Sequence, residues 1–324
     1  MSDLQDMIVD VFEKILKQHC TKETVDLLEE GLWGTDLWQV IVDNELQNIA
    51  VSEGCGGAGG DIADLLTLYR LCGKYAAPIP FVEHTLANFC WEAVGGTPTD
   101  DLSTIALSSA QVTGSSEMPY VPWGRYAKYA VTVMKQGDMY YLVRFLIDET
   151  MTKLATNLAT EPRDTIYSNG QSMERIEISS ERVLFIQKLV TAAQISRMVG
   201  AIEQAVALSI RFSKEREQFG RPIHRFQLVQ QHLAVLAGEE AICTAALQNL
   251  AQVLQDNEDQ FEVAFATISL DAATKTVAAS AHQIHAAIGV TYEHRLHHFT
   301  RRLWAWRDEG LSARFWQQQM ARNL

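Results

Sequence analysis

The segment Arg-Glu-Gln-Phe-Gly-Arg-Pro-Ile-His-Arg-Phe-Gln occupies residues 216–227, between two long stretches of helical periodicity. Gly220 can supply a backbone angle that other residues avoid, and Pro222 can begin the next element. The segment is therefore expected to be a turn between two helices. The preceding helix carries one apolar stripe with steps of four, three, four and four residues, formed by Ile195, Val199, Ile202, Val206 and Ile210.

Three side chains of this turn suit a phosphorylated ligand. Arg216 offers a planar fork that matches a pyrophosphate, Phe219 offers an aromatic face, and Gln227 places an amide near a helix N-terminus. The alternative is a helix-capping turn whose charges are incidental.

Helical periodicity continues to the end of the chain. A second long helix is expected over residues 227–255, a third over 261–289, and a fourth from near Tyr292. Short connections between long helices favour an antiparallel four-helix bundle, which we assign to residues 181–324.

Residues 1–180 show different sequence patterns from the C-terminal part of the chain. Residues 1–102 are expected to form a helical domain, with amphipathic helices over 3–17 and 61–75. Residues 103–180 hold β-branched and aromatic runs with hairpin signals at 136–138 and 169–170, and predict a small antiparallel β domain. The fold class is therefore α+β and mostly α.

The glycine-rich loop between the two N-terminal helices matches a dinucleotide-binding pattern. Residues 54–59, Gly-Cys-Gly-Gly-Ala-Gly, fit G-x-G-x-x-G. However, no alternation of strand and helix follows, and that context is what gives the pattern its meaning. A flexible loop between helices is the preferred interpretation, with a nicotinamide oxidoreductase as the alternative.

Composition excludes several classes of function. The chain has 324 residues, 47% of them apolar, and a net charge of −13. This negative charge argues against nucleic acid and anionic membranes as partners. The five scattered cysteines form no zinc or disulfide pattern, and neither a signal peptide nor a transmembrane run is evident. We therefore expect a soluble, cytoplasmic protein.

Histidines gather near the C-terminus, but their spacing lacks the HExxH pattern. We expect no metal site there, and treat these residues as polar surface or interface histidines: His282, His285, His294, His297 and His298. The nearby tryptophans are expected to serve packing or a subunit interface: Trp304, Trp306 and Trp316.

Three segments together resemble the acyl-CoA dehydrogenase family. The turn at 216–227 resembles that family's Arg-x-x-Phe-Gly-x-x-Ile motif and closing Gln. Residues 283–293, Gln-Ile-His-Ala-Ala-Ile-Gly-Val-Thr-Tyr-Glu, resemble its Gln-x-x-Gly-Gly-x-Gly-x-Thr-x-Glu segment, and the loop at 54–60 resembles its N-terminal glycine loop. The α–β–α domain order agrees.

The resemblance implies an FAD enzyme that oxidises an acyl-CoA thioester to its 2,3-enoyl form. In the family, a carboxylate removes the α-proton and the flavin accepts a hydride. The bundle turn of one subunit binds FAD that is held mainly by a neighbour. By position, the implied cofactor contacts are Arg216, Gln218, Phe219, Ile223, Gln227, Gln283, Ala286 and Ala287. The last two replace the family's paired glycines.

The resemblance also shows departures. Residues 109–118 and 129–134 lack the family's Thr-Glu-Pro-x-x-Gly-Ser-Asp segment and Trp-x-Thr strand, which cradle the flavin ring. Glu309 falls where many members carry the catalytic base, with Asp308 beside it. The family's alternative base position falls near Val190, where no acid exists. A solvated acid at a helix end, beside Arg307, is the alternative role for Glu309.

A short chain with an altered β domain resembles one subunit type of the heterotetrameric (α2β2) acyl-CoA dehydrogenases of bacterial sterol and bile-acid side-chain degradation. The implied partners are an acyl-CoA substrate, a homologous subunit that shares FAD, and an electron-transferring flavoprotein. The alternatives are a non-catalytic subunit that supports the partner's FAD site, and a homotetrameric dehydrogenase of a smaller acyl-CoA.

Overall fold

The chain passes repeatedly between two separately packed units. In the computed structural model, the described residues are 3–107, 116–168, 173–256 and 261–323. One unit, called here the helical unit, comprises Met1–Val25, Leu66–Ala77 and Thr191–Leu324. The other, called the mixed unit, comprises Asp26–Leu65 and Pro78–Val190.

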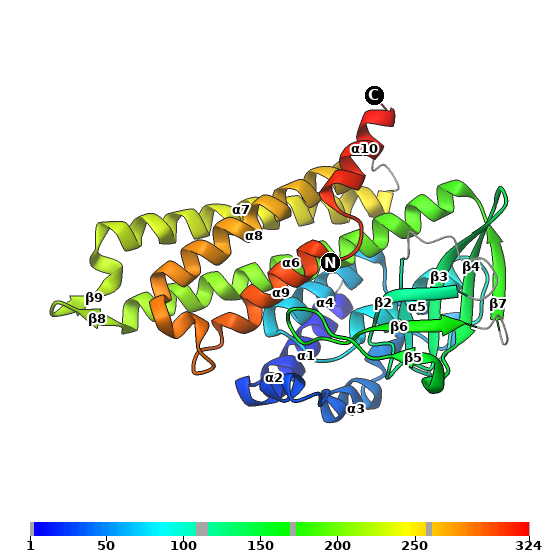
Figure 1. The fold of residues 1–324 in the computed structure, drawn as a ribbon, viewed down its shortest axis with the longest axis horizontal. Coiled ribbons are helices and arrows are strands. Elements are labelled where there is room, and N and C mark those ends of the chain that lie inside the picture. Colours follow the sequence, from blue (N-terminus) through cyan, green and yellow to red (C-terminus); the bar gives the residue numbers. More distant parts are fainter. Residues whose placement is uncertain (1–2, 108–115, 169–172, 257–260, 324) are drawn as a thin grey trace. The chain divides into compact units, whose positions relative to one another are not determined.

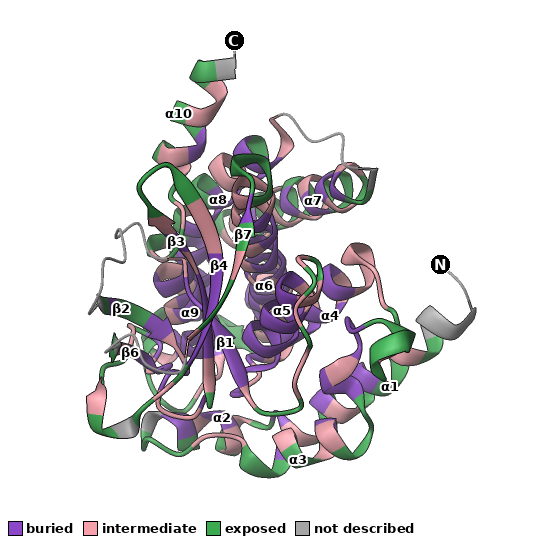
Figure 2. Ribbon diagram, turned by 90° about the vertical axis from the view of Figure 1, so that its right-hand side faces the viewer, coloured by how far each residue is buried: buried purple, intermediate pink, exposed green. Residues whose placement is uncertain are grey.

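The N-terminal third is helical, as predicted. Its helices are α1 (Asp3–His19), α2 (Lys22–Glu29), α3 (Thr35–Asp43), α4 (Ile62–Tyr75) and α5 (Phe81–Glu92), with short 3-10 turns at Leu46–Asn48 and Glu53–Cys55. The sequence predicted α1 and α4 nearly to the residue. Helix α5, which packs on β1 and β3, was missed because almost every residue in it is buried, so that it shows no apolar stripe (Figure 2).

Two small sheets follow. The first has the order β1-β3-β4-β7 and contains Ser103–Ile105, Tyr129–Gln136, Met139–Leu146 and Met173–Ile178. The second has the order β2-β6-β5 and contains Ser116–Pro122, Arg163–Ser168 and Thr152–Lys153. A core between them includes Met118, Phe145 and Ile166.

The β region is mainly antiparallel, as predicted, apart from the parallel pairing of β1 with β3. The hairpin expected at residues 136–138 joins β3 to β4 and is confirmed. The turn expected at 169–170 lies outside the described residues. Its flanking strands, β6 and β7, pair in different sheets, so the predicted hairpin between them is wrong.

The C-terminal helices confirm the predicted bundle. They are α6 (Ser180–Glu215), α7 (Gln227–Asp256), α8 (Glu262–His285), α9 (Leu296–Asp308) and α10 (Ala313–Asn323). Helices α7 and α8 lie side by side along their length, and α8 also contacts α9 and α10 (Figure 1). Four of the five stripe residues of α6 are buried, and Ile210 is half-buried. Among the described residues, no helix combines the length and apolarity that crossing a membrane requires.

Candidate cofactor-binding surface

Residues 216–222 form a projecting hairpin, called here the arm. Strands β8 (Glu217–Gln218) and β9 (Arg221–Pro222) pair antiparallel, and the arm extends beyond the ends of α6 and α7 (Figure 1). At its tip, Phe219 and Gly220 have φ angles of 51° and 76°. Two consecutive positive φ angles define the tight two-residue turn that matches the twist of a hairpin.

The arm is exposed and its root is anchored. Phe219 is 91% exposed at the tip, whereas Ile223, just beyond the arm, is buried. Behind the tip, the Phe226 ring lies edge-on to Phe219 at 6.1 Å between ring centroids, and the Arg221 guanidinium lies 4.3 Å from the same ring. The sequence did not single out this Arg221–Phe226 pair, although both residues lie in the motif.

The second expected cofactor segment is the end of α8 and the 3-10 turn Ala286–Val290 that follows it. Gln283, Ala286 and Ala287 are all exposed. Ala286 has φ 52° and ψ −140°, a conformation in which glycine is favoured and a Cβ atom is strained. The family's glycine at this position is therefore explained by the backbone, and alanine occupies it here at a cost.

The structure brings both segments to one end of the helical unit. Because α7 and α8 form an antiparallel pair, Gln227 at the start of α7 lies at the same end as His285 at the end of α8. The arm begins four residues after Phe212, whose ring stacks on His285 with centroids 4.5 Å apart. Arg216, Gln218, Gln227 and Gln283 are exposed at this end of the unit.

These residues fit the pyrophosphate and adenosine part of FAD. Arg216 is exposed and, among the residues described by the structure, its guanidinium has no ion pair. A free guanidinium and neighbouring amide side chains are donors that match pyrophosphate oxygens. Phe219 supplies an open aromatic face.

Glu309 does not lie at the arm end of the helical unit. It caps the C-terminal end of α9, and the 13 residues of that helix place it about 20 Å from the arm end. Gly310 follows with φ 70°, so the chain turns sharply there. The neighbouring Asp308 is exposed, and its Oδ1 lies 2.7 Å from Arg307 Nη2. Arg307 therefore pairs with Asp308.

Contacts of α9 place the Glu309 turn beside a specific part of α6. The Gln194 amide donates to the Trp306 carbonyl oxygen, and the Arg197 guanidinium lies 5.0 Å from the Trp306 ring. Gln194 is one helical turn after Val190, the position of the family's alternative base.

The prediction of polar surface or interface histidines is wrong for three of the five residues, whereas His282 and His294 are half-buried. His285, His297 and His298 are buried, and their rings pack against other aromatic rings. Burial lowers the pKa of His285 to about 4, and the pKa of His294 is also lowered, chiefly by burial and by Arg211. Trp306 and Trp316 are buried, as expected of packing residues.

The glycine-rich loop has no free phosphate cradle. The backbone N–H groups of Gly56, Gly57, Gly59 and Gly60 all donate to backbone carbonyls of residues 49–53. A Cβ atom at Gly57 would lie 2.2 Å from the Val51 carbonyl oxygen, so this glycine is required for tight folding of the loop. The preference for a connecting loop over a dinucleotide site is thereby supported.

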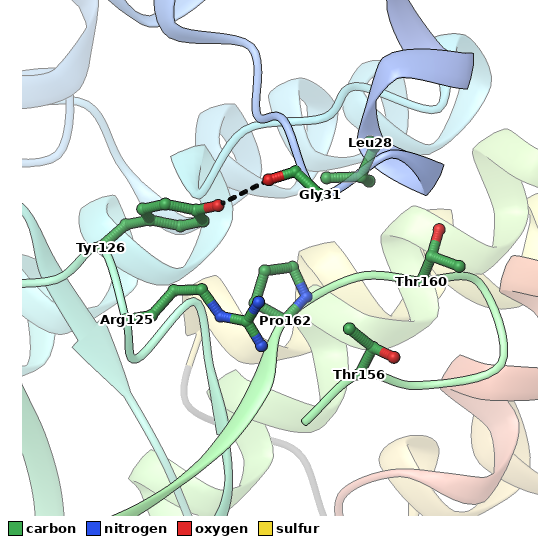
Figure 3. Close-up of a pocket in the computed structure, with 7 residues that line it drawn as sticks. All are labelled: Leu28, Gly31, Arg125, Tyr126, Thr156, Thr160 and Pro162. Atoms are coloured by element: carbon green, nitrogen blue, oxygen red, sulfur yellow. Dashed lines mark hydrogen bonds between the residues drawn. The ribbon is translucent and has the colours of Figure 1, made fainter. Parts of the chain in front are cut away.

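The mixed unit contains a cavity of about 120 Å³ that none of the predicted site residues line (Figure 3). The Arg125 guanidinium forms one wall and is held by buried Asp164, with Nη2 2.6 Å from Oδ1. The Tyr126 hydroxyl donates to the Gly31 carbonyl oxygen at 3.2 Å. Because the arginine is already paired, these contacts stabilise the unit.

Comparison with known proteins agrees with this geometry. Residues 189–307 match the family described as acyl-CoA dehydrogenase, C-terminal domain. The acyl-CoA dehydrogenase IpdE2 of Mycolicibacterium smegmatis is 25% identical over 309 residues, covering 93% of each chain. The ChsE4–ChsE5 complex of Mycobacterium tuberculosis is similar in structure, with a TM-score of 0.84, 18% identity and coverage of 100% of this chain and 97% of that chain. A Tcur3481–Tcur3483 steroid ACAD variant also has a TM-score of 0.84, at 18% identity, covering 99% of this chain and 97% of that chain.

Residues 189–307, which hold the arm and most of the helical bundle, match the C-terminal domain of acyl-CoA dehydrogenases. The chain as a whole is similar to acyl-CoA dehydrogenases at 24–27% sequence identity.

Proposed function

We propose that this chain is one subunit of a hetero-oligomeric acyl-CoA dehydrogenase that shares its FAD with a homologous partner chain. The observation that carries this proposal is the arm. The arm carries an exposed Phe219 and an exposed Arg216 whose guanidinium has no ion pair among the described residues, and it projects from the end of its own unit (Figure 1). Side chains in this arrangement suit a ligand that another chain also holds.

The helix that follows the arm supports an oligomer. Leu228, Val235 and Ile242 are 63%, 38% and 56% exposed on α7, at spacings of seven residues. Apolar residues repeating every seven positions form a seam that a helix of the partner subunit would cover. The seam starts next to the arm, so that one partner would meet both. The structural similarity to a two-component complex, ChsE4–ChsE5, agrees with this assignment.

The proposed reaction is the α,β-dehydrogenation of an acyl-CoA thioester. FAD, when bound, supplies the hydride acceptor. Arg216, Gln218 and Gln227 would bind the pyrophosphate side of the shared cofactor, with Gln283 and the backbone at Ala286 on the adjoining face. Glu309 would take the α-proton of the substrate, because a carboxylate at the end of a helix next to a glycine turn can be presented to a ligand.

We further propose that the acyl group is bulky, of the steroid side-chain class. The support is the steroid ACAD among the structural neighbours. An electron-transferring flavoprotein is proposed as the electron acceptor, since the family resemblance implies one. Turnover of a steroid side-chain CoA ester against butyryl-CoA, followed by reduction of purified electron-transferring flavoprotein, tests both statements. Preference for butyryl-CoA would instead favour the dehydrogenase of a smaller acyl-CoA.

The decisive experiment is the visible absorption spectrum of the purified chain, first alone and then co-expressed with the homologous subunit. A colourless lone chain that becomes yellow with its partner supports a shared site. Flavin bands near one FAD per lone chain would overturn the proposal. In the complex, Arg216→Ala should release FAD, whereas Arg314→Ala, an exposed arginine on α10, should not.

A second variant separates the active subunit from a purely supporting one. Glu309→Gln removes the carboxylate and preserves its size. Loss of turnover with FAD still bound supports Glu309 as the base. Unchanged turnover would assign catalysis to the partner subunit and leave this chain a supporting role.

A further inference from the structure

Three aromatic rings lie at the root of the arm, one from each of three segments. Phe212 near the end of α6 stacks on His285 at the end of α8, with ring centroids 4.5 Å apart and planes 22° from parallel. His294, just before α9, lies 4.5 Å from His285 and 5.9 Å from Phe212. His285 is only 2% exposed, so this ring is enclosed by its neighbours.

The proton on His285 can be assigned from its contacts. Its Nδ1 atom lies 2.8 Å from the Ala281 carbonyl oxygen. A carbonyl oxygen only accepts, so Nδ1 carries the hydrogen and Nε2 holds a lone pair. Within the part of the chain that the structure describes, Nε2 has no hydrogen-bond partner. The imidazole ring is therefore neutral, and it packs against its neighbours through its flat face.

The stacked rings of His285 and Phe212 connect the two segments of the proposed cofactor site. On one side, the Arg216 backbone N–H donates to the Phe212 carbonyl oxygen at 2.9 Å, so the arm starts directly from the stacked residue. On the other side, His285 immediately precedes the strained Ala286. Gly289 closes the turn against it, where a Cβ atom would lie only 2.8 Å from the His285 Cβ atom.

We propose that His285 is a positioning residue for the cofactor: its stack with Phe212 fixes the spacing between the Arg216 guanidinium and the backbone at Ala286. His285 does not itself touch FAD, since it is buried beneath the turn. The inference rests on the proposed function, because it takes these two segments as the pyrophosphate-binding surface. This spacing requires a flat ring at position 285 and does not require the imidazole nitrogen atoms.

The test is an FAD titration of the complex with its partner subunit, after removal of bound flavin. His285→Phe keeps a flat ring and should bind FAD within twofold of the unchanged protein. His285→Leu fills similar space without a flat face and should weaken FAD binding about five- to tenfold, the scale of one aromatic stack. His232→Leu on α7, whose ring contacts neither Phe212 nor His285 among the described residues, is the control and should bind normally.

Phe212→Leu removes the other ring of the Phe212–His285 stack. It provides the test if His285→Leu does not fold. It should weaken FAD binding as much as His285→Leu, and the double variant should be no weaker than either alone. Melting temperatures measured without FAD distinguish a positioning role from a purely structural one. A purely structural role would lower the melting temperature of the leucine variants and leave their FAD dissociation constants unchanged. That result, or equal weakening by His285→Phe and His285→Leu, would overturn the inference.

Failure of the inference is distinguishable from failure of the proposed function. If Arg216→Ala weakens FAD binding and both leucine variants do not, the cofactor surface stands and the positioning role is refuted. If Arg216→Ala also binds FAD normally, the cofactor surface itself is wrong.

Discussion

Replacing Gly200 by alanine should force α4 and α6 apart. A Cβ atom at Gly200 would lie 1.8 Å from the Arg70 carbonyl oxygen, and one at Gly73 would lie 1.9 Å from the Arg197 carbonyl oxygen. Both obstructing atoms belong to helix backbone, which cannot rotate away as a side chain can. Since non-bonded atoms prefer about 3.5 Å, the helices would have to separate by roughly 1.5 Å.

The expected loss follows from two opposing terms. Overpacking a tight contact costs about 1–3 kcal/mol or more, and this clash lies at the severe end. Alanine gains about 1 kcal/mol over glycine in a helix. We therefore expect the free energy of unfolding of Gly200→Ala to fall by at least about 2 kcal/mol. Separation would also stretch the ion pair between Arg70 and Glu203, now 3.2 Å.

The assay is thermal unfolding followed by circular dichroism, with Gly54→Ala as control. At Gly54 the nearest atom to a new Cβ is Ser52 Oγ at 3.9 Å, so that variant should differ by less than about 0.5 kcal/mol. Gly73→Ala should be as damaging as Gly200→Ala, and the double variant should lose less than the sum. A Gly200→Ala protein at least as stable as the unchanged chain would refute the reasoning.

Three further predictions concern stability. Asp164→Asn should cost about 3–5 kcal/mol in chemical unfolding, because the fully buried Asp164 carboxylate would no longer neutralise the half-buried Arg125 guanidinium. Asp101→Asn, in an exposed ion pair, should cost under about 1 kcal/mol. Ala286→Gly should raise the free energy of unfolding of the flavin-free chain by about 1 kcal/mol, because it relieves backbone strain. Ala287 has no positive φ, so Ala287→Gly should lower the free energy of unfolding. Equal effects of the two substitutions would argue against strain at Ala286. The pKa of His285 is lowered from 6.5 to about 4 by burial, so the unfolded chain takes up a proton first and the free energy of unfolding should fall between pH 6.5 and 4. His285→Phe should remove about 3 kcal/mol of that loss, and an unchanged pH profile would show that His285 is not responsible.

Helices that lie at a surface were predictable, and buried ones were not. The apolar stripe on α6 and the amphipathic pattern of α1 each correctly indicated a helix with one buried face. Helix α5 has no exposed face, because it is covered on nearly all sides, and its sequence therefore carries no period to detect. Burial of His285 was missed for a related reason: sequence shows a polar residue, and only the fold shows the aromatic rings that enclose it.

Turn residues revealed where the chain reverses, but not how. Gly220 and Pro222 placed the junction of α6 and α7 correctly. The positive φ of Phe219 was not predictable, since a bulky residue rarely adopts it; the ladder of β8 and β9 imposes it. The same applies to Ala286, whose strained angle becomes visible only when the end of α8 is built.

The division of the chain into two units bears on how a subunit can lose part of a cofactor site. The arm is held by its own two-stranded ladder and by Phe212, all within the helical unit. The strand that would follow the family's flavin-ring pattern, β3, belongs to the mixed unit and packs in a separate core. Substitutions on that strand therefore leave the arm's supporting contacts unchanged. The shared FAD site proposed above draws on Arg216 in the arm and not on β3, so the cofactor experiments use the assembled complex.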